Sequence, residues 1–240
     1  MESFALPNAK FNHVRCGNCP IRERAVCAYC AGEELALLDA MKSYRDHAAG
    51  VELMAAGEAA PFVASIVTGA VKLTKTLIDG RTQMVGLLFP GDFMGHPMRP
   101  HAEYDAVTAT PVTLCTFQRG PFERLLREKP ALEKRLLQMT LNELDAARDW
   151  LLLLGRKTAR ERVASFLLML ARREAAGRGG GALHLALPLT RAEIAEYLGM
   201  TIETVSRQLT KLRADEVVAF DSTRALRLPD LGRLAEEAGE

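Results

Sequence analysis

Cysteine is the residue whose type and spacing most clearly indicate chemistry in this sequence. The chain has 5 cysteines, and all but one lie in the stretch RCGNCPIRERAVCAYC at residues 15–30. In a reducing compartment such a group is typical of a metal, iron–sulfur or redox site rather than of a disulfide framework, and the odd total supports this. The remaining cysteine, Cys115, is either a buried structural thiol or a distant ligand.

Spacing alone leaves the kind of metal site open. Cys16 and Cys19 form one C-x-x-C pair, and Cys27 and Cys30 form a second. Four thiolates at this spacing suit a compact structural zinc site. Thiolates are also the ligands of iron–sulfur clusters, so iron–sulfur ligation is the other interpretation.

The overall composition predicts a folded protein. Of 240 residues, 48% are apolar and 25% are charged, which is ordinary for globular proteins and allows two domains or one large one. No apolar run reaches the length of a membrane span, and residues 1–15 lack the apolar core of a secretory signal. We therefore expect a cytoplasmic protein with no membrane partner. The net charge of +1 gives no global indication of nucleic-acid binding.

The middle of the chain predicts an antiparallel β-structure. From about Val51 to Phe117, short apolar stretches are separated by glycines, and AVKLTKTL shows the period-two alternation of a strand. The Asp-Gly pair in IDGRT is a strong hairpin signal between two such stretches. These patterns predict a sandwich or barrel of short strands.

A long helix is predicted after Pro130, where apolar residues recur every three to five positions without a proline. Because one domain cannot easily cover this helix, we expect a dimer seam that also packs on the sheet; a core helix of a larger domain is the alternative. A further helix over 158–173 leads into GRGGG at 177–181, which is typical of a linker. The apolar pattern is formed by Leu132, Leu136, Met139, Leu144, Ala147, Leu151 and Leu154.

The most specific stretch is LTRAEIAEYLGMTIETVSRQLTKLRADEVV at residues 189–218. Thr190 and Glu193 have the spacing of a capping box, which begins a short helix that ends at Gly199, and Thr201 begins the next helix. Two short helices joined by a tight turn are the layout of a helix-turn-helix, whose second helix enters the major groove of DNA. On that helix we predict an inward face of Ile202, Val205, Leu209 and Leu212, and an outward face of Glu203, Ser206, Arg207 and Thr210.

The outward face suits the reading of bases. Arginine reads guanine through two hydrogen bonds, and glutamate accepts one from cytosine, so Arg207, Glu203 and the adjacent Ser206 are candidate DNA-binding residues. The alternative is a plain surface ion pair, because Glu203 and Arg207 are four residues apart on one helix.

These motifs resemble the CRP/FNR superfamily of bacterial transcription regulators over the whole chain. GAVKLTKTLIDGRTQMVGLLFPGDFMG is similar to its cyclic-nucleotide-binding-type β-roll, 130–155 to its dimerisation helix, and ETVSR at 203–207 to the recognition helix of the oxygen-sensing FNR branch. The resemblance implies an α+β fold and a homodimer on inverted half-sites similar to TTGAT. The implied segments are a Cys-rich cluster-binding segment (1–30), a β-roll sensory domain (31–129), a dimerisation helix (130–157) and a winged helix-turn-helix DNA-binding domain (158–240).

The same resemblance implies a role for the cysteines. FNR-type proteins hold a [4Fe-4S] cluster with three N-terminal cysteines and one from the β-roll, which correspond here to Cys16, Cys19, Cys27 and Cys115, with Cys30 as a spare. The C-x2-C-x7-C spacing lengthens the loop of the enteric version without changing the number of ligands. The family likeness further implies that the intact cluster favours the DNA-binding dimer, and that oxygen converts it to [2Fe-2S] and separates the dimer.

Two more roles follow from the resemblance. Asp149 matches an acidic position on the dimerisation helix, where like charges across the seam are expected to hold the cluster-free form apart. The exposed turn of Asp79, Gly80 and Arg81 is expected to touch RNA polymerase, with a plain hairpin tip as the alternative.

Other functions fit less well. Cyclic-nucleotide binding on this fold needs an Arg-Ser pair, whereas Arg99 is followed by proline, so we expect no cyclic nucleotide. A haem sensor would use His96 or His101, each of which is more typical of an ordinary surface or hydrogen-bonding histidine. We find no P-loop, G-x-S-x-G or H-E-x-x-H motif and expect no enzyme. The alternative function is a regulator of the same fold with a structural four-cysteine zinc site and a different signal.

Overall fold

The computed structural model describes residues 14–175 and 183–240. The chain forms two compact units, one ending at Leu144 and one beginning at Asp145, and each is described by itself. The predicted linker at 177–181 lies outside the described residues, and the division into four segments stays a prediction. Within the described ranges, no helix is long and apolar enough to cross a membrane.

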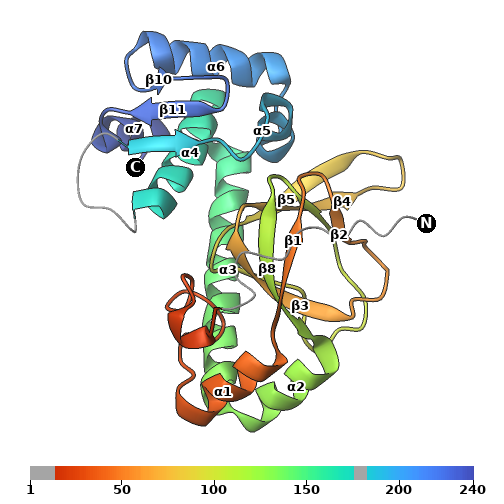
Figure 1. The fold of residues 1–240 in the computed structure, drawn as a ribbon. Coiled ribbons are helices and arrows are strands. Elements are labelled where there is room, and N and C mark those ends of the chain that lie inside the picture. The colour runs from red at the N-terminus through yellow and green to blue at the C-terminus, as the bar shows by residue number, and fades with distance from the viewer. Residues whose placement is uncertain (1–13, 176–182) are drawn as a thin grey trace. The chain divides into compact units, whose positions relative to one another are not determined.

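The first unit contains two four-stranded antiparallel sheets, which confirms the expected β-roll (Figure 1). One sheet has the strand order β1-β8-β3-β6 and the other the order β2-β7-β4-β5. The strands are β1 (Ser43–His47), β2 (Glu52–Met54), β3 (Phe62–Thr68), β4 (Val71–Thr76), β5 (Thr82–Leu88), β6 (Phe93–Met94), β7 (Asp105–Thr108) and β8 (Val112–Gln118).

The turn between β4 and β5 confirms the hairpin predicted at IDGRT. The N–H of Leu77 donates to the carbonyl oxygen of Arg81 at 2.8 Å, and Gly80 has φ 84°, a conformation that glycine adopts without strain. The carboxylate of Asp79 forms an ion pair with Arg81 at 2.8 Å. Ile78 is fully exposed at this tip, so the turn presents an apolar side chain beside its charges.

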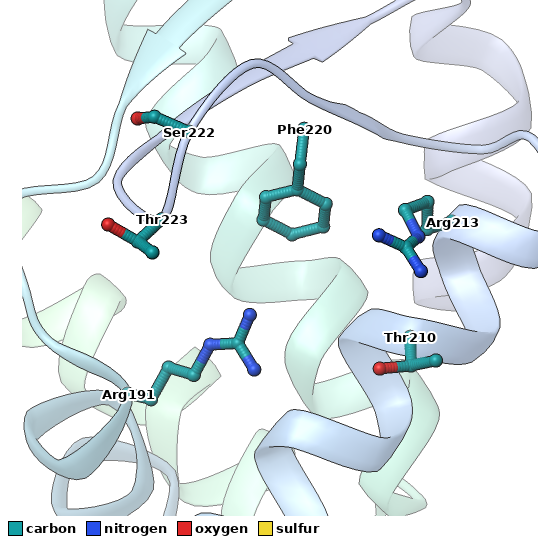
Figure 2. A pocket seen from close by; sticks show the side chains of 6 residues that line it. All are labelled: Arg191, Thr210, Arg213, Phe220, Ser222 and Thr223. Atoms are coloured by element: carbon teal, nitrogen blue, oxygen red, sulfur yellow. The ribbon is translucent and has the colours of Figure 1, made fainter.

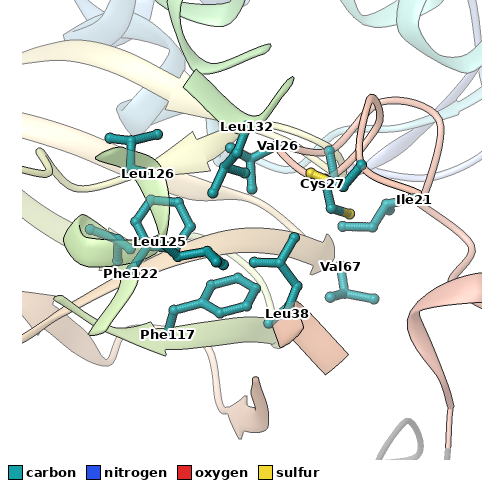
Figure 3. Close-up of a cluster of buried hydrophobic side chains, with 14 of the residues drawn as sticks. Ile21, Val26, Cys27, Leu38, Val67, Phe117, Phe122, Leu125, Leu126 and Leu132 are labelled. Carbon is teal, nitrogen blue, oxygen red and sulfur yellow. The ribbon is translucent and has the colours of Figure 1, made fainter. Parts of the chain in front are cut away.

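Side chains from the first sheet enter two separate cores, because successive residues of a strand point to opposite faces. Ala64, Ile66 and Leu114 join a core shared with the second sheet. The opposite face contributes Val63, Val67 and Cys115 to a second core, shown in Figure 3, which we call the cysteine-side core. That core consists of Ile21, Ala25, Val26, Cys27, Cys30, Leu38, Tyr44, Val63, Val67, Cys115, Phe117, Phe122, Leu125, Leu126 and Leu132.

Three helices contribute to the cysteine-side core, namely α1 (Gly32–Met41), α2 (Arg119–Glu128) and the start of α3 (Pro130–Arg156). On α3, Leu132 is buried and Leu136 and Met139 pack against this core. The helix therefore packs on the first sheet, as predicted. It also keeps large apolar side chains exposed, which are Leu137, Leu141, Leu144, Leu151 and Leu152.

The second unit has the helices and hairpin of a winged helix-turn-helix. Its small sheet has the order β10-β11-β9, and the hairpin β10–β11 forms the wing that follows the two short helices. The elements are α4 (Ala159–Ala175), β9 (Leu183–Ala186), α5 (Arg191–Leu198), α6 (Ile202–Ala214), β10 (Ala219–Phe220), β11 (Ala225–Leu228) and α7 (Leu231–Ala238).

Candidate metal centre and nucleic-acid interface

Four side chains form a row across the first sheet, one from each strand. Tyr44 of β1 and Ser65 of β3 are both paired in register with Cys115 of β8, and Phe93 of β6 is paired with Ser65. Residues directly opposite each other in antiparallel strands share a face, so the row lies on the cysteine-side core. The sheet therefore brings Cys115 to the face on which the N-terminal cysteines pack.

The cysteine loop, residues 15–30, packs on this face. Cys16 lies in the short 3-10 helix η1 (Cys16–Asn18), and it is buried, as are Cys27 and Cys115. Cys19 is half-buried, and its sulfur accepts a hydrogen bond from the Tyr44 hydroxyl at 3.7 Å. All of these thiols are free rather than disulfide-bonded.

The pKa values of the buried thiols are shifted by burial and by neighbouring groups. Burial raises the pKa of Cys115, and the thiols of Cys16, Cys19 and Cys27 raise that pKa further. Burial raises the pKa of Cys30 to about 11, and the additional causes are Glu34 and Cys27. The thiols of Cys16, Cys19 and Cys27 thus lie close enough to Cys115 to raise its pKa, and Cys30 lies in the same cysteine-side core. The choice of Cys16, Cys19, Cys27 and Cys115 as the ligands, with Cys30 as a spare, stays a prediction from the family resemblance.

The cysteine side chains match the donor set of an iron–sulfur cluster. Among the described residues, no three His, Cys, Asp or Glu side chains are placed to hold one metal ion. A structural zinc site brings its sulfurs to about 2.3 Å from one point. A [4Fe-4S] cluster instead takes four thiolates, one for each of its irons. Buried, unpaired thiols are also the donor set that iron–sulfur clusters use, so the residues present fit this group.

Polar contacts hold the backbone of the cysteine loop. The guanidinium of Arg22 donates to the carbonyl oxygens of Cys27, at 2.5 Å, and Cys30. The carboxylate of Asp39 on α1 accepts from the N–H of Cys16 at 2.7 Å. Arg135 on α3 also donates to loop carbonyls. Sequence reasoning missed Asp39, Arg135 and Ser65, because only the fold brings them to the loop or to Cys115.

The helix-turn-helix forms as predicted, with one exception. The side chains of Thr190 and Glu193 make the capping box, and Gly199 ends α5 with φ 60°. On α6, Val205, Leu209 and Leu212 are buried, but Ile202 is 48% exposed. The inward assignment of Ile202 was wrong, because the residue lies in the first turn of the helix, where no preceding turn covers it.

The predicted base-reading residues lie on the accessible side of α6. Glu203 and Arg207 are exposed, and Ser206 is half-buried. The expected alternative, an ion pair between Glu203 and Arg207, is not formed in the described chain. Glu203 instead has a lowered pKa, because its own backbone N–H and the Thr201 side chain stabilise its carboxylate at the start of the helix.

A polar pocket between α5, α6 and the wing was not found from the sequence. It has a volume of about 210 Å³ and presents two guanidinium groups together with hydroxyl groups around Phe220, as Figure 2 shows. Within the described ranges, neither Arg191 nor Arg213 has an ion-pair partner. Two cationic side chains that lack such a partner favour the binding of an anionic group in the pocket. The lining residues are Arg191, Thr210, Arg213, Phe220, Ser222 and Thr223.

One arginine connects three elements of the second unit. Arg162 on α4 donates to the carbonyl oxygens of Leu154, at 2.6 Å, Lys157, at 3.0 Å, and Leu198, at 3.2 Å. These carbonyls lie at the end of α3, before α4 and at the end of α5. Trp150 of α3 stacks on Tyr197 of α5 with ring centres 3.9 Å apart. The last turns of α3 therefore position the first helix of the helix-turn-helix.

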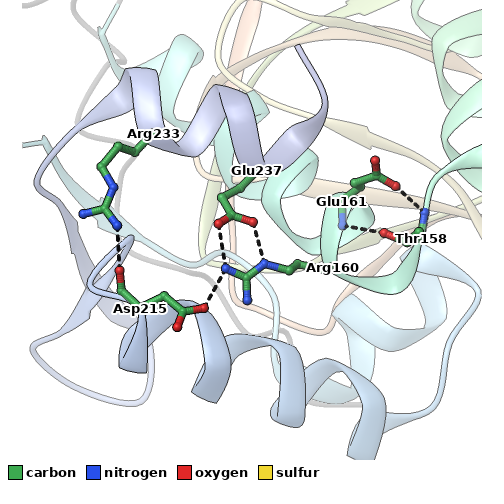
Figure 4. Close-up of polar contacts among 6 residues, drawn as sticks. All are labelled: Thr158, Arg160, Glu161, Asp215, Arg233 and Glu237. Carbon is green, nitrogen blue, oxygen red and sulfur yellow. Dashed lines mark hydrogen bonds and ion pairs between the residues drawn. The ribbon is translucent and has the colours of Figure 1, made fainter.

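A second arginine joins α4 to α6 and α7, as Figure 4 shows. Arg160 forms a two-pronged contact with Glu237 of α7, with one N–O distance of 2.7 Å, and an ion pair with Asp215 at 2.8 Å. The Arg160 side chain holds the pKa of Glu237 below its usual value. This contact fixes the C-terminal helix α7 against α4.

Other residues singled out in the sequence have clear positions. Asp149 is exposed on α3, and Asp79, Gly80 and Arg81 are exposed at the hairpin tip. The Arg99 side chain forms an ion pair with Glu103 at 3.0 Å. His96 packs edge-on against Tyr104, with ring centres 5.7 Å apart.

The two units together define a class of protein. A β-roll followed by a long helix and a winged helix-turn-helix is the architecture of regulators that couple a sensory domain to DNA. Residues 44–129 match the cyclic nucleotide-binding domain, and residues 161–237 match the Crp-like helix-turn-helix domain.

Similarity to characterised proteins covers most of the chain, which belongs to the CRP/FNR family of DNA-binding transcription regulators. The transcriptional activator protein FnrL of Cereibacter sphaeroides is 52% identical over 94% of this chain and 92% of its own length. The nitrogen fixation regulation protein FixK of Bradyrhizobium diazoefficiens is 37% identical over 89% of this chain and 88% of its own. The structure of FixK2 from Bradyrhizobium japonicum superposes with a TM-score of 0.74 at 35% identity, covering 81% of this chain and 96% of that one.

Proposed function

We propose that this protein is an oxygen-responsive transcription regulator that acts in the cytoplasm as a homodimer. One observation carries the proposal: Cys115 of β8 lies on the same buried face as Cys16, Cys19 and Cys27, although it is distant from them in the sequence. Four free thiols in one place supply one thiolate for each iron of a [4Fe-4S] cluster.

When bound, the cluster supplies an oxygen-sensitive centre, as the likeness to the FNR branch implies. The protein's own residues determine how a bound cluster fixes the position of the cysteine loop. Cys16, Cys19 and Cys27 tie the loop to Cys115 on the sheet, and Arg135 connects the loop backbone to α3. The loop is thus fixed on the helix that carries the exposed leucines.

The exposed leucines of α3 are the proposed dimer seam. Leu137, Leu141 and Leu144 follow spacings of four and three residues, and Leu151 lies seven residues after Leu144. This is the repeat of a coiled-coil seam. Fully burying one leucine contributes about 1.5–3 kcal/mol, so a few leucines suffice for a switchable dimer. Asp149 flanks the seam and opposes association through like-charge repulsion when the cluster is lost.

Dimerisation places two α6 helices on inverted half-sites similar to TTGAT. Arg207, Glu203 and Ser206 read base edges, and the pocket around Arg191 and Arg213 holds a backbone phosphate. Several relatives are described as transcriptional activators, which supports activation through a contact with RNA polymerase. The exposed tip of Asp79, Gly80 and Arg81 is the proposed contact. Because Arg99 is followed by Pro100 instead of the serine of an Arg-Ser pair, we propose that no cyclic nucleotide is bound.

The test is metal analysis of protein purified without oxygen, with Cys115→Ala and Cys30→Ala as a matched pair. We expect about four irons and four sulfides per chain in the wild type and in Cys30→Ala, and their loss in Cys115→Ala. Visible absorption should bleach in air. One zinc and no sulfide, with zinc lost in Cys30→Ala and kept in Cys115→Ala, would instead establish the structural zinc alternative.

A further inference from the structure

Ser65 carries the most unusual polar group in the described chain. The residue is 2% exposed, and its hydroxyl is the one buried side-chain nitrogen or oxygen among residues 14–175 and 183–240 that has no hydrogen-bond partner. Native proteins pair nearly all buried polar groups, because an unsatisfied one retains the full cost of its desolvation. An orphaned hydroxyl in a well-formed sheet therefore indicates a missing partner.

The strand register places this hydroxyl beside a candidate ligand. Ser65 of β3 is paired directly with Cys115 of β8, and Tyr44 is paired with Cys115 from the other side. Side chains in such a pair have Cβ atoms about 4.5–5.5 Å apart and point to the same face. Val63 and Val67, two residues before and after Ser65, both lie in the cysteine-side core. The Ser65 hydroxyl consequently faces the region where Cys16, Cys19, Cys27 and Cys115 gather.

Neighbouring hydroxyls of the same sheet are already paired. Ser43 and Thr116 share a hydrogen bond of 2.8 Å, and the hydroxyl of Thr113 donates to Asp46 at 2.6 Å. Tyr44 donates to the sulfur of Cys19. The missing partner is thus specific to Ser65, and it is not a general property of the polar residues in these strands.

We propose that the Ser65 hydroxyl donates a hydrogen bond to a sulfur of the bound cluster, either the Cys115 thiolate or an adjacent sulfide. The inference rests on the proposed function. A neutral thiol is a weak acceptor, whereas a metal-bound thiolate or sulfide carries negative charge and accepts strongly. Ser65 is a positioning and tuning residue in this proposal. Hydrogen bonds to cluster sulfurs stabilise the more negative, reduced state, so this donor raises the reduction potential and slows oxidation.

The test compares Ser65→Thr with Ser65→Val, since these side chains have nearly the same shape and differ in one hydroxyl. The full-length protein is reconstituted anaerobically with iron and sulfide, and the midpoint potential, the rate of bleaching in air and the resonance Raman iron–sulfur stretching bands are measured. Thr116→Val is the control, because it removes a buried hydroxyl from β8 at a position paired with Ala64, outside the cysteine row.

We expect Ser65→Thr and Thr116→Val to retain the wild-type potential. Ser65→Val should have a lower potential, several-fold faster bleaching and shifted iron–sulfur bands. Identical potentials and bands in the Thr and Val variants would overturn the inference. If the wild type binds iron and sulfide normally, that result leaves the proposed function intact; if the wild type binds no cluster, both fail.

A second measurement uses the cluster-free protein, in which the hydroxyl lacks its partner. Ser65→Ala is expected to raise the Tm of the cluster-free form, because it removes an unsatisfied buried group. The same variant should lose its cluster faster than the wild type. A lower Tm of cluster-free Ser65→Ala would show that the hydroxyl is already satisfied without the cluster and would refute the proposal.

Discussion

The guanidinium of Arg135 on α3 and the carbonyl oxygen of Ala25 in the cysteine loop are joined by a hydrogen bond of 3.1 Å. A second N–H of the same guanidinium donates to the carbonyl oxygen of Arg24 at 2.5 Å. The cation also lies 5.4 Å from the centre of the Tyr29 ring, a favourable distance for a cation–π contact. One side chain of the proposed dimer helix thus holds the loop that carries three proposed cluster ligands.

Replacing Arg135 with Gln is expected to weaken the dependence of dimerisation on the cluster. The dimer dissociation constant should be measured by anaerobic sedimentation with and without the cluster. We expect the ratio of the two constants to fall by about tenfold, which corresponds to about 1.4 kcal/mol of coupling. Lys134→Gln is the control, because it removes the same charge from an exposed neighbouring position. An unchanged ratio in Arg135→Gln would mean that the loop acts on α3 through another contact.

The substitution Asp149→Ala is expected to stabilise the dimer of the cluster-free protein, which is the proposed form in air. Two carboxylates brought within about 4 Å of each other across a seam cost about 1 kcal/mol in water, so their removal should tighten the cluster-free dimer about fivefold. Added salt should tighten the wild-type dimer in the same direction, because it screens this repulsion. A variant that stays as monomeric as the wild type at low salt would exclude the role of Asp149.

The local sequence pattern was sufficient to predict some structural features and insufficient to predict others. The capping box of Thr190 and Glu193 and the turn at Gly80 depend on neighbouring residues, so the sequence predicted both. Ile202 fits the helical period of the buried face but lies in the first turn, and periodicity contains no information about what covers a helix end. Local reasoning therefore succeeds where the partner group is a few residues away.

The candidate metal site depends on contacts between distant residues. Only the family resemblance linked Cys115 to the N-terminal cysteines, because their proximity comes from the pairing of β8 and the packing of the loop. Ser65 and Arg135 carry no motif, and their roles follow from strand register and from one long-range hydrogen bond. The polar pocket similarly depends on α5, α6 and the wing, which together bring Arg191 and Arg213 to its lining.

Arg213→Gln is expected to weaken DNA binding without changing base preference. If each subunit neutralises one phosphate in the pocket, the slope of log K against log salt should become shallower by about 1.8 for the dimer, which is about 0.9 for each phosphate. Arg207→Gln provides the contrast, because it should reduce binding to the specific operator far more than binding to unrelated DNA. Equal salt slopes for the wild type and Arg213→Gln would remove the pocket from the DNA interface.

The contact between Arg160 and Glu237 predicts how the stability of the DNA-binding unit depends on pH. Because the pKa of Glu237 is lower in the folded protein than in the unfolded chain, the unfolded chain binds this proton first as the pH falls. The contribution of this contact to the free energy of unfolding is therefore complete above the pKa of Glu in the unfolded chain, about 4.3. It is lost as the pH falls through the pKa of Glu237 in the folded protein. Glu237→Gln should cost about 1 kcal/mol or less at neutral pH, with the difference from wild type shrinking towards pH 3. Glu236→Gln is the control, because it removes the same charge from an exposed position of α7. This variant should leave the free energy of unfolding nearly unchanged across the pH range. An equal loss of stability in both variants would show that the effect comes from net charge instead of from the Arg160 contact.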